Sequence, residues 1–255
     1  MKLLPYKVES FGRSDIGLVR TNNEDVFRIV PEKQFYILAD GMGGHNAGEI
    51  AALTAVNSTC SAVQALTDIC TVEQICTLLR EAMRFANETV YTLSHNNKAY
   101  SGMGTTLSCF ALTDKALIYA HVGDSRLYRM RKTLKQLSED HSLRRTMLVS
   151  EERRYTDLPP SLYRNILTKA IGTHPYVTAD IGVIPICPDD IYMLCSDGLT
   201  DCVPEEVIAK MLIVDAPLEE IANQLIQYAL EKGGNDNITI LLVKIVSHEA
   251  AHLPR

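Results

Sequence analysis

Hydrophobic and polar positions alternate along the chain in a way that separates strands from helices. Short apolar runs at Tyr6–Phe11, Val26–Val30 and Phe35–Ala39 are typical of strands. The alanine-rich segment Ala47–Leu66 that follows is typical of a helix. The N-terminal part of the chain therefore predicts strands first and helices after them.

The segment Val72–Leu93 is the clearest helix in the sequence. Its apolar residues recur every three or four positions and form one stripe. Thr71 and Gln74 predict a capping box at its start. A stripe of this kind packs against a core, so it carries no functional signal.

Beyond residue 104 the pattern turns to β structure and then back to helices. Three short apolar runs between Gly104 and Leu137 are separated by polar or glycine turns, which predicts an antiparallel meander. The remaining predicted elements are a buried strand at Ile191–Cys195, helices at Pro204–Leu212 and Leu218–Leu230, and a buried strand at Ile238–Val246. Strands that cluster apart from pairs of amphipathic helices predict an α+β fold in which helices cover packed sheets.

Composition limits the size of the fold and excludes one class of function. The chain has 255 residues, 46% of them hydrophobic, which suffices for one large domain or two small ones. No linker or repeat divides it, so we expect a single domain over residues 1–255. A nucleic-acid binder should be basic, but 25 Lys and Arg stand against 31 Asp and Glu, a net charge of −6. We therefore expect no nucleic-acid partner.

Cysteines and apolar runs bear on the location of the protein. The seven cysteines include no C-x-x-C, and most stand among apolar residues, as expected of small buried side chains in a reducing compartment. The apolar run at the start is too short for a signal peptide, and no run of about 18 apolar residues could cross a membrane. These features predict a cytoplasmic protein without membrane contact.

Four aspartates lie at the ends of apolar strands. Asp40 and Asp197 each end a buried strand as Asp-Gly, Asp124 stands at a corner between strands, and Asp236 precedes the last strand. Each one alone is compatible with a simple turn, because Asp-Gly is a common turn dipeptide. The four together favour a metal site, since buried carboxylates need a cation or another partner. An all-oxygen ligand set suits Mg²⁺ or Mn²⁺, and paired ions can activate a water for attack on phosphorus.

Two further polar segments carry candidate residues. Arg20 places a guanidinium that fits phosphate oxygens near Glu24 and Asp25, although an ordinary polar loop would read the same way. The glycine-rich segment from Asp40 to His45 precedes a helix and could cradle an anion, or His45 could be a plain polar residue at the helix entry. The motifs of cysteine phosphatases, serine hydrolases, zinc proteases and P-loop enzymes are missing from the sequence.

Eight motifs occur in order along the chain. They are R-T-N-N-E-D, L-A-D-G-M-G-G-H, G-M-G-T-T, H-V-G-D-S-R, E-D-H-S, L-T-K-A-I-G, L-C-S-D-G-L-T-D and G-G-N-D-N-I-T. From about Phe11 to Val246 the chain therefore resembles the PPM-type metal-dependent serine/threonine protein phosphatases (protein phosphatase 2C-like), in particular the small bacterial ones. The resemblance implies a β-sandwich of two antiparallel sheets flanked by pairs of helices, in four layers. It also implies hydrolysis of phosphoserine and phosphothreonine in proteins by direct attack of a metal-activated water.

The resemblance also implies a role for each acid at the strand ends. Asp40 matches the aspartate that bridges two tightly bound Mn²⁺ or Mg²⁺ ions, and Gly41 matches the residue whose carbonyl completes one of them. Asp197 and Asp236 match ligands of the second ion. Asp124 matches the extra acid that bacterial members use, together with Asp197, for a weaker third ion.

Three residues near the start of the chain take their expected roles from the same resemblance. Glu24 and Asp25 match acids that act on the first ion through water, and Arg20 matches the phosphate-binding arginine. Met42 departs from the animal members, which have a histidine there as proposed general acid. His45 or a water on the third ion could serve instead, and the sequence does not choose between them.

The polar segment Ser142–Asn165 predicts a surface excursion of helix and loop, and it matches in position the family's flap next to the active site. Two pairs of arginines in this segment follow no pattern that assigns a role and are compatible with a solvated surface: Arg144, Arg145, Arg153 and Arg154. As partners we expect phosphorylated proteins and a cognate Ser/Thr kinase, with the chain itself a monomer. Two alternatives stay open, a catalytically silent phosphoprotein-binding module of the same fold and a metal-dependent phosphodiesterase.

Overall fold

The computed structural model describes residues 6–43, 47–66, 70–149 and 166–247, which form two antiparallel sheets packed face to face. The strands of the first sheet lie in the order β1 (Tyr6–Asp15), β11 (Ile238–Ser247), β10 (Ile191–Cys195), β7 (Arg126–Met130) and β8 (Leu134–Gln136). The strands of the second lie in the order β2 (Asp25–Val30), β3 (Phe35–Met42), β5 (Leu107–Leu112), β6 (Ala116–Val122) and β9 (Asp180–Pro185), with β4 (Gly104–Thr105) paired to β3.

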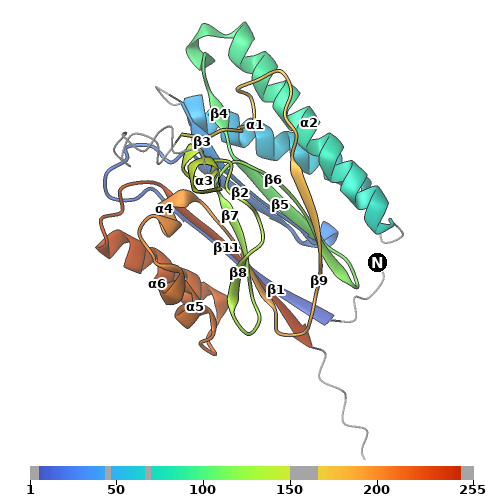
Figure 1. Cartoon of the computed structure of the whole chain (residues 1–255), viewed down its shortest axis with the longest axis vertical. Coiled ribbons are helices and arrows are strands. Elements are labelled where there is room, and N and C mark those ends of the chain that lie inside the picture. The colour runs from blue at the N-terminus through green and yellow to red at the C-terminus, as the bar shows by residue number, and fades with distance from the viewer. Residues whose placement is uncertain (1–5, 44–46, 67–69, 150–165, 248–255) are drawn as a thin grey trace, which may run out of the picture.

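Helices cover the outer face of each sheet, as Figure 1 shows. The long helices α1 (Ala47–Ala62) and α2 (Val72–Asn96) pack on the second sheet, and α5 (Glu205–Leu212) and α6 (Leu218–Glu231) pack on the first. Two short helices, α3 (Leu143–Val149) and α4 (Asp197–Thr200), lie at one end of the sheets. The predicted α+β sandwich in four layers is therefore confirmed. No helix in the described part of the chain is both long and apolar enough to cross a membrane.

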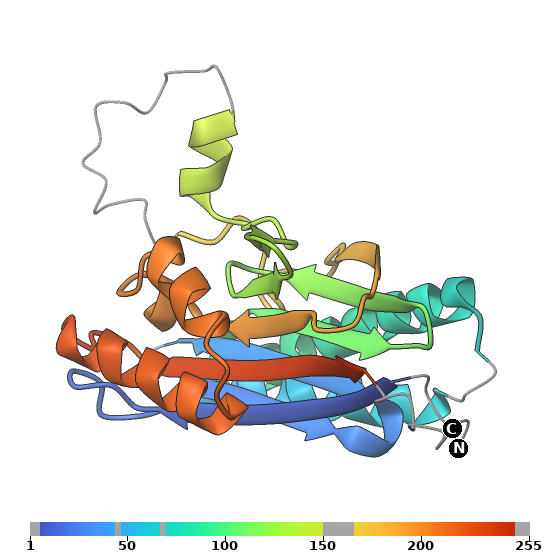
Figure 2. The same cartoon turned by 90° about the horizontal axis from the view of Figure 1, so that it is seen from below.

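Three apolar clusters fill the spaces between the four layers. The cluster between the sheets is rich in aromatic side chains, with Tyr36 stacked on Phe110 at 4.9 Å between ring centroids and Tyr192 next to them. The other two clusters lie between each sheet and its helix pair. Figure 2 shows the arrangement of the sheets and helices from a second side. Each sheet thus buries both of its faces, which is why strands such as β10 read as unbroken apolar runs.

Most predicted elements are confirmed, with two corrections. The capping box of α2 is present, with Thr71 Oγ1 accepting from Gln74 N and Gln74 Oε1 accepting from Thr71 N. The predicted meander between Gly104 and Leu137 is wrong, because β5 and β6 belong to the second sheet while β7 and β8 belong to the first. The pattern also missed β9, a mostly half-buried edge strand whose apolar residues are interrupted by Gly182 and Pro185.

Candidate active site

The acids at the strand ends meet at one end of the sandwich. Asp25, at the start of β2, pairs directly with Asp40, near the end of β3. Asp197 opens α4 immediately after β10, and Asp236 lies just before β11, the antiparallel neighbour of β10. Asp124 lies in the turn after β6, whose end pairs with the start of β5 beside β3. The register of both sheets therefore brings all five aspartates to the same end.

The pKa values of these carboxylates reflect both their burial and the charges of the neighbouring acids. Burial, followed by the charges of Asp25, Asp197, Asp124 and Asp236, holds the pKa of Asp40 well above its ordinary value. Burial and then Asp124 and Asp236 raise the pKa of Asp197 in the same way. Since a carboxylate is costly to bury beside like charges, this end of the molecule favours a bound cation.

Backbone hydrogen bonds fix the position of Asp40. Its N–H donates to Thr106 Oγ1 at 2.9 Å, and its carbonyl accepts from Thr106 N at 2.8 Å. The N–H of Gly41 donates to the carbonyl of Glu24 at 3.0 Å. A Cβ at Gly41 would lie 2.2 Å from Gly48 O on α1, so only glycine fits between this strand end and the helix.

Asp25 links the two sheets at the centre of the acids. Its Oδ2 accepts from Ser196 Oγ at 2.7 Å and from Thr239 Oγ1 at 2.6 Å, both on the first sheet's side. Its Oδ1 is buried and has no hydrogen-bond partner among the described residues. Burial raises the pKa of Asp25 to about 6, against the opposing effect of the two hydroxyl donors. An unpartnered buried carboxylate oxygen is the kind of atom that a cation satisfies.

Arg20 reaches the acids through an ion pair with Asp236. Its Nη2 lies 2.7 Å from Asp236 Oδ2, and the two side chains are 50% and 30% exposed. The loop that carries Arg20 is held by Asn237, whose Nδ2 donates to Ile16 O and Asn22 O, both at 2.9 Å. The structure thus places Arg20 beside the acids, as the sequence predicted. Its partner there is Asp236, which the sequence predicted to bind metal.

Glu24 lies at the same end, against the start of α1. Its N–H donates to Asn237 Oδ1 at 2.8 Å, and a Cβ at Gly48 would lie 2.3 Å from Glu24 Oε2. Burial raises its pKa, Arg20 opposes that shift, and Asp236 adds to it. Glu24 therefore belongs to the same group of interacting charges as Asp236.

Asp124 has a second set of charged neighbours. Burial and then Asp140 raise its pKa to about 6, Arg126 lowers it, and Asp201 raises it. Arg126 itself forms a forked pair with Asp140, with Nε 3.0 Å from Oδ1 and Nη2 2.7 Å from Oδ2. Asp201, at the end of α4, also raises the pKa of Asp197. It therefore adds an acid near Asp124 and Asp197 that sequence reasoning missed.

The missed residues share one recognisable signal in the sequence. Ser196, Thr239 and Asn237 are polar residues at the edges of buried apolar strands, and all three are themselves buried. Polar side chains in such places need hydrogen-bond partners, and here those partners are Asp25 and the loop of Arg20. Their positions in S-D-G and N-D-N-I-T could have identified them as supports of the site.

Two predicted features fall partly or wholly beyond the described residues. His45, in 44–46, lies outside the described residues, and so do Arg153 and Arg154 of the predicted flap. The base of the flap is described: Ser142 pairs with Leu167 as a β-bridge, and α3 follows. On α3, Arg145 Nε lies 3.0 Å from Glu139 Oε1, in an exposed ion pair.

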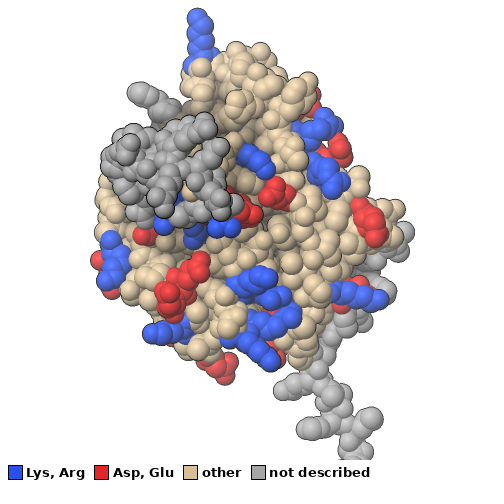
Figure 3. All heavy atoms as spheres, in the orientation of Figure 1, with Lys and Arg blue, Asp and Glu red and all other residues tan. Residues whose placement is uncertain are grey.

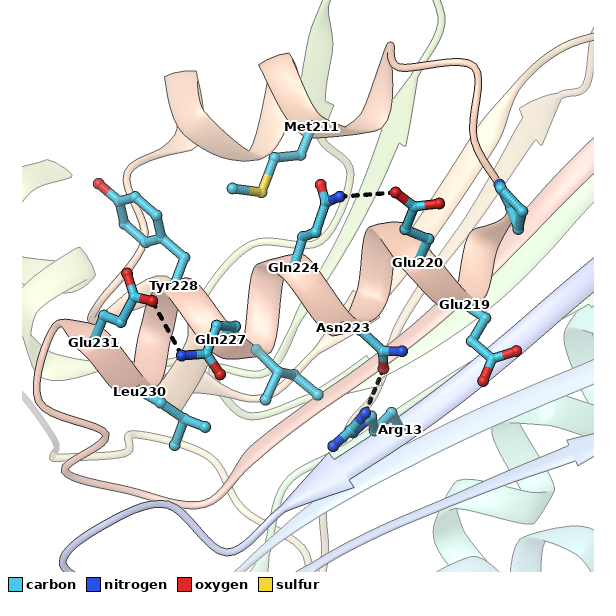
Figure 4. Close-up of a pocket in the computed structure, with 12 residues that line it drawn as sticks. Arg13, Met211, Glu219, Glu220, Asn223, Gln224, Gln227, Tyr228, Leu230 and Glu231 are labelled. Atoms are coloured by element: carbon cyan, nitrogen blue, oxygen red, sulfur yellow. Dashed lines mark hydrogen bonds between the residues drawn. The ribbon is translucent and has the colours of Figure 1, made fainter.

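Hollows in the described surface do not all belong to this end. A pocket of about 280 Å³ lies at the base of α3 and is lined by Arg126, Asp140, Arg144 and Arg145, among others. A larger hollow of about 800 Å³ lies along α6, where side chains of α6 pair with each other and Asn223 accepts from Arg13 (Figure 4). None of the predicted site residues lines the larger hollow, so its size carries no chemistry.

The distribution of charge argues against a polyanionic ligand such as a nucleic acid and favours a divalent metal ion at the site. Basic and acidic side chains are intermixed over the described part of the face in Figure 3, without a continuous basic track for a polyanion. Among the described residues, no group of three or more Asp, Glu, His or Cys side chains lies close enough together to coordinate a metal ion as it stands. The all-oxygen donor set, the raised pKa values and the unpartnered Oδ1 of Asp25 fit Mn²⁺ or Mg²⁺ better than Zn²⁺.

Comparisons with known proteins agree with the geometry. The family model of protein phosphatase 2C matches residues 18–238. The serine/threonine phosphatase Stp of Listeria welshimeri is 39% identical over 236 residues, which cover 91% of this chain and 94% of that protein. The S. agalactiae serine/threonine phosphatase has a TM-score of 0.84 and 34% identity, over 94% of this chain and 100% of that one. The catalytic domain of the phosphatase PstP, solved in complex with two manganese ions, has a TM-score of 0.80 and 32% identity, over 94% and 98% of the two chains.

Proposed function

The chain belongs to the protein phosphatase 2C family, and from that premise we propose that it is a metal-dependent phosphatase that hydrolyses phosphoserine and phosphothreonine in proteins. The observation that carries the proposal is the meeting of Asp25, Asp40, Asp124 and Asp197 at one end of the sandwich, each with a raised pKa. A catalytically silent module would have no need to maintain such a concentration of buried charge.

The residues that would hold Mn²⁺ or Mg²⁺ are those that the family resemblance assigns. Asp40 and the carbonyl of Gly41 would bind the first ion, and Asp40, Asp197 and Asp236 the second. Bound ions of this kind activate a water for attack on phosphorus and neutralise phosphate charge. Glu24 and Asp25 would act on the first ion through water, and Asp124 would hold a weaker third ion with Asp197.

Residues of the chain itself supply positioning and a positive charge for the substrate. The pair with Asp236 uses one of the five N–H donors of Arg20, and the remaining donors can bind phosphate oxygens. Ser196 and Thr239 orient Asp25 from the opposite sheet, and Thr106 fixes Asp40. The leaving serine or threonine oxygen must gain a proton, and His45 and a water on the third ion both stay candidate donors.

A substrate test separates this proposal from its alternatives. Chelator-treated enzyme is supplied with Mn²⁺ and assayed on an aryl phosphate monoester, the corresponding diester and a phosphothreonine peptide. We expect turnover of the monoester and the peptide, loss of both on adding EDTA, and little turnover of the diester. Full activity in excess EDTA would exclude the metal-dependent mechanism, preferential diester hydrolysis would favour a phosphodiesterase, and no turnover at all would favour the silent module.

The cellular setting completes the proposal. We propose a single catalytic domain over residues 1–255 that acts as a cytoplasmic monomer and opposes a Ser/Thr kinase, since an enzyme must install the phosphate that this one removes. Affinity capture with the Asp40→Asn protein, followed by phosphopeptide analysis of what it retains, would identify the substrates.

A further inference from the structure

The turn that carries Asp124 is held from two sides. The chain crosses from β6 to β7, and therefore from one sheet to the other, through Gly123, Asp124 and Ser125. On one side Thr106 fixes the turn, since its Oγ1 lies 2.7 Å from Ser125 Oγ and a Cβ at Gly123 would lie 2.6 Å from Thr106 Cβ. Gly123 has a φ of +114°, which favours glycine there.

His141 holds the same turn from the other side. Its N–H donates to Gly123 O at 2.7 Å, and its Nδ1 accepts from Gly123 N at 3.1 Å. A backbone N–H is only a donor, so Nδ1 must carry no hydrogen and Nε2 must carry one. Nε2 lies 3.1 Å from Asp180 Oδ2, the acceptor which that tautomer requires. Lys169 Nζ lies 3.3 Å from both Asp180 Oδ1 and His141 Nε2, and its ammonium, which can only donate, pairs with the Asp180 carboxylate.

The ring of His141 is fixed by buried neighbours. It stacks on His121 with 5.0 Å between ring centroids, and burial lowers the pKa of His121 to about 4, so that ring stays neutral near pH 7. His121 is itself bonded at both nitrogens, to Ser108 Oγ at 2.8 Å and Glu139 O at 3.0 Å. The carbonyl of His141 accepts from Thr168 N at 2.8 Å, next to the base of the flap.

We propose that His141 is a positioning residue: the bond from Gly123 N to His141 Nδ1 sets the place of the Asp124 carboxylate, and so the affinity of the weak metal site. The proposal rests on the proposed function, because Asp124 is assigned to a third ion there. His141 does not touch the reacting atoms. Asp180 acts one step further back, since it keeps the hydrogen of the imidazole on Nε2.

Two substitutions separate the bond to Gly123 from the bulk of the ring. In His141→Asn, the amide oxygen can occupy the place of Nδ1 and still accept from Gly123 N. In His141→Gln, the polar end reaches instead toward the place of Nε2 and Asp180, and the acceptor for Gly123 is lost. His95→Gln is the matched control, because His95 is an exposed histidine near the end of α2, in an outer helical layer and distant in sequence from His141.

The first measurement tests the hydrogen bond without metal. Amide hydrogen exchange at Gly123, followed by NMR in EDTA, should speed up on the order of 10-fold in His141→Gln, because one hydrogen bond is lost. It should stay near wild type in His141→Asn and His95→Gln. Equal exchange rates in the Asn and Gln variants would overturn the proposed bond.

The second measurement tests its consequence for the metal. Calorimetric titration with Mn²⁺ should show a weak class of site whose Kd rises about 10-fold in His141→Gln, the lower range for loss of an outer partner of a metal ligand, with the tight sites unchanged. Asp124→Ala should remove that weak class, and adding His141→Gln to it should change nothing further. A weak class that survives Asp124→Ala would overturn the third-ion assignment, whereas one that Asp124→Ala removes but His141→Gln leaves intact would overturn the role of His141.

Discussion

One carboxylate oxygen of Asp25 is hydrogen-bonded across the two sheets, and the other is buried without a compensating positive charge among the described residues. Its Oδ2 ties β2 to the start of β11 through Thr239 and to Ser196 after β10, whereas its Oδ1 is buried and has no partner in the part of the chain that the structure describes. A side chain present only to join the sheets would have both oxygens satisfied. The arrangement is expected where a residue helps to bind a cation at some cost in stability.

The substitution Asp25→Asn separates these two roles. An amide oxygen can still accept from Ser196 and Thr239, while the buried charge disappears. In EDTA at pH 7.5 we expect the Tm to equal or exceed that of wild type, and we expect Mn²⁺ to raise it less. Thermal unfolding with and without Mn²⁺ measures both effects, with Asp114→Asn, an exposed aspartate in the turn between β5 and β6, as control. A lower Tm in EDTA with an unchanged response to Mn²⁺ would make Asp25 purely structural.

Arg20→Ala tests the phosphate-binding role. The loss of a charged hydrogen bond to substrate, about 2–3 kcal/mol, should raise KM with a smaller change in kcat. Stability should change little, because the pair with Asp236 is exposed and such pairs contribute about 0–1 kcal/mol. Steady-state kinetics on the aryl phosphate and the phosphopeptide decide the matter. Arg13→Ala removes an arginine bonded to Asn223 on the outer surface and serves as control.

Unchanged kinetics in Arg20→Ala would identify this arginine as an ordinary loop residue.

The sequence could place Arg20 near the acids only through a motif, because its loop is ordered by long-range hydrogen bonds from Asn237 that no local pattern encodes. The same holds for the hydroxyl pair on Asp25. In contrast, Asp40 and Asp197 could be found in the sequence, since each stands as Asp-Gly at the end of an apolar run.

At the scale of elements, the step from β6 to β7 shows what a local pattern leaves open. Both strands read as short apolar runs separated by a polar turn, and the pattern is the same whether the strands pair or join different sheets. In the structure, the positive φ of Gly123 and its contacts with Thr106 and His141 hold the turn in the conformation that takes the chain from the second sheet to the first. Helix α2 could be predicted to its cap, because its stripe and capping box are both local.

The one-turn helix α4 depends on a close contact with the loop before β11. A Cβ at Gly198 would lie 2.1 Å from Asn237 O, which is backbone and cannot move aside cheaply. We expect Gly198→Ala to lower the free energy of unfolding by about 1–3 kcal/mol, as overpacking does, and to weaken Mn²⁺ binding by displacing Asp197. Urea unfolding and metal titration measure the two effects.

Gly102→Ala provides the comparison for α4. Gly102 has a φ of +80° but nothing within 4 Å of a Cβ, so alanine there should cost only the backbone strain, about 1–2 kcal/mol, and should leave Mn²⁺ affinity unchanged. Equal Mn²⁺ affinity in both variants would show that Gly198 serves packing alone.

At the scale of the whole molecule, the gathered carboxylates couple folding to metal and pH. Burial and the charges of neighbouring acids raise the pKa of Asp25 and of Asp124 from 3.8 to about 6, and they hold that of Asp40 well above its ordinary value. The folded state thus binds protons more tightly than the unfolded state at these groups. Their contribution to stability is complete below about pH 3.8 and is lost as the pH rises through 6, in the protein without metal. His121 acts in the opposite sense, because its pKa is lowered from 6.5 to about 4 and stability is lost as the pH falls between those values.

The difference in Tm between Mn²⁺-saturated and EDTA-treated protein at one pH cancels the contribution of His121 and isolates the acids. We expect that difference to grow from pH 5 to pH 7.5, because at pH 5 the ions must displace protons from the carboxylates and at pH 7.5 they relieve repulsion between them. With the same free Mn²⁺ concentration at both pH values, set to 100 times the Kd at pH 7.5, mass action adds about 2.7 kcal/mol at pH 7.5, or roughly 5–10 °C for a chain of this size, and less at pH 5, where the Kd is larger. Differential scanning calorimetry at both pH values measures it, and Asp40→Asn should reduce the rise at pH 7.5. A rise in Tm that is the same at both pH values would mean that the ions do not bind at the titrating carboxylates.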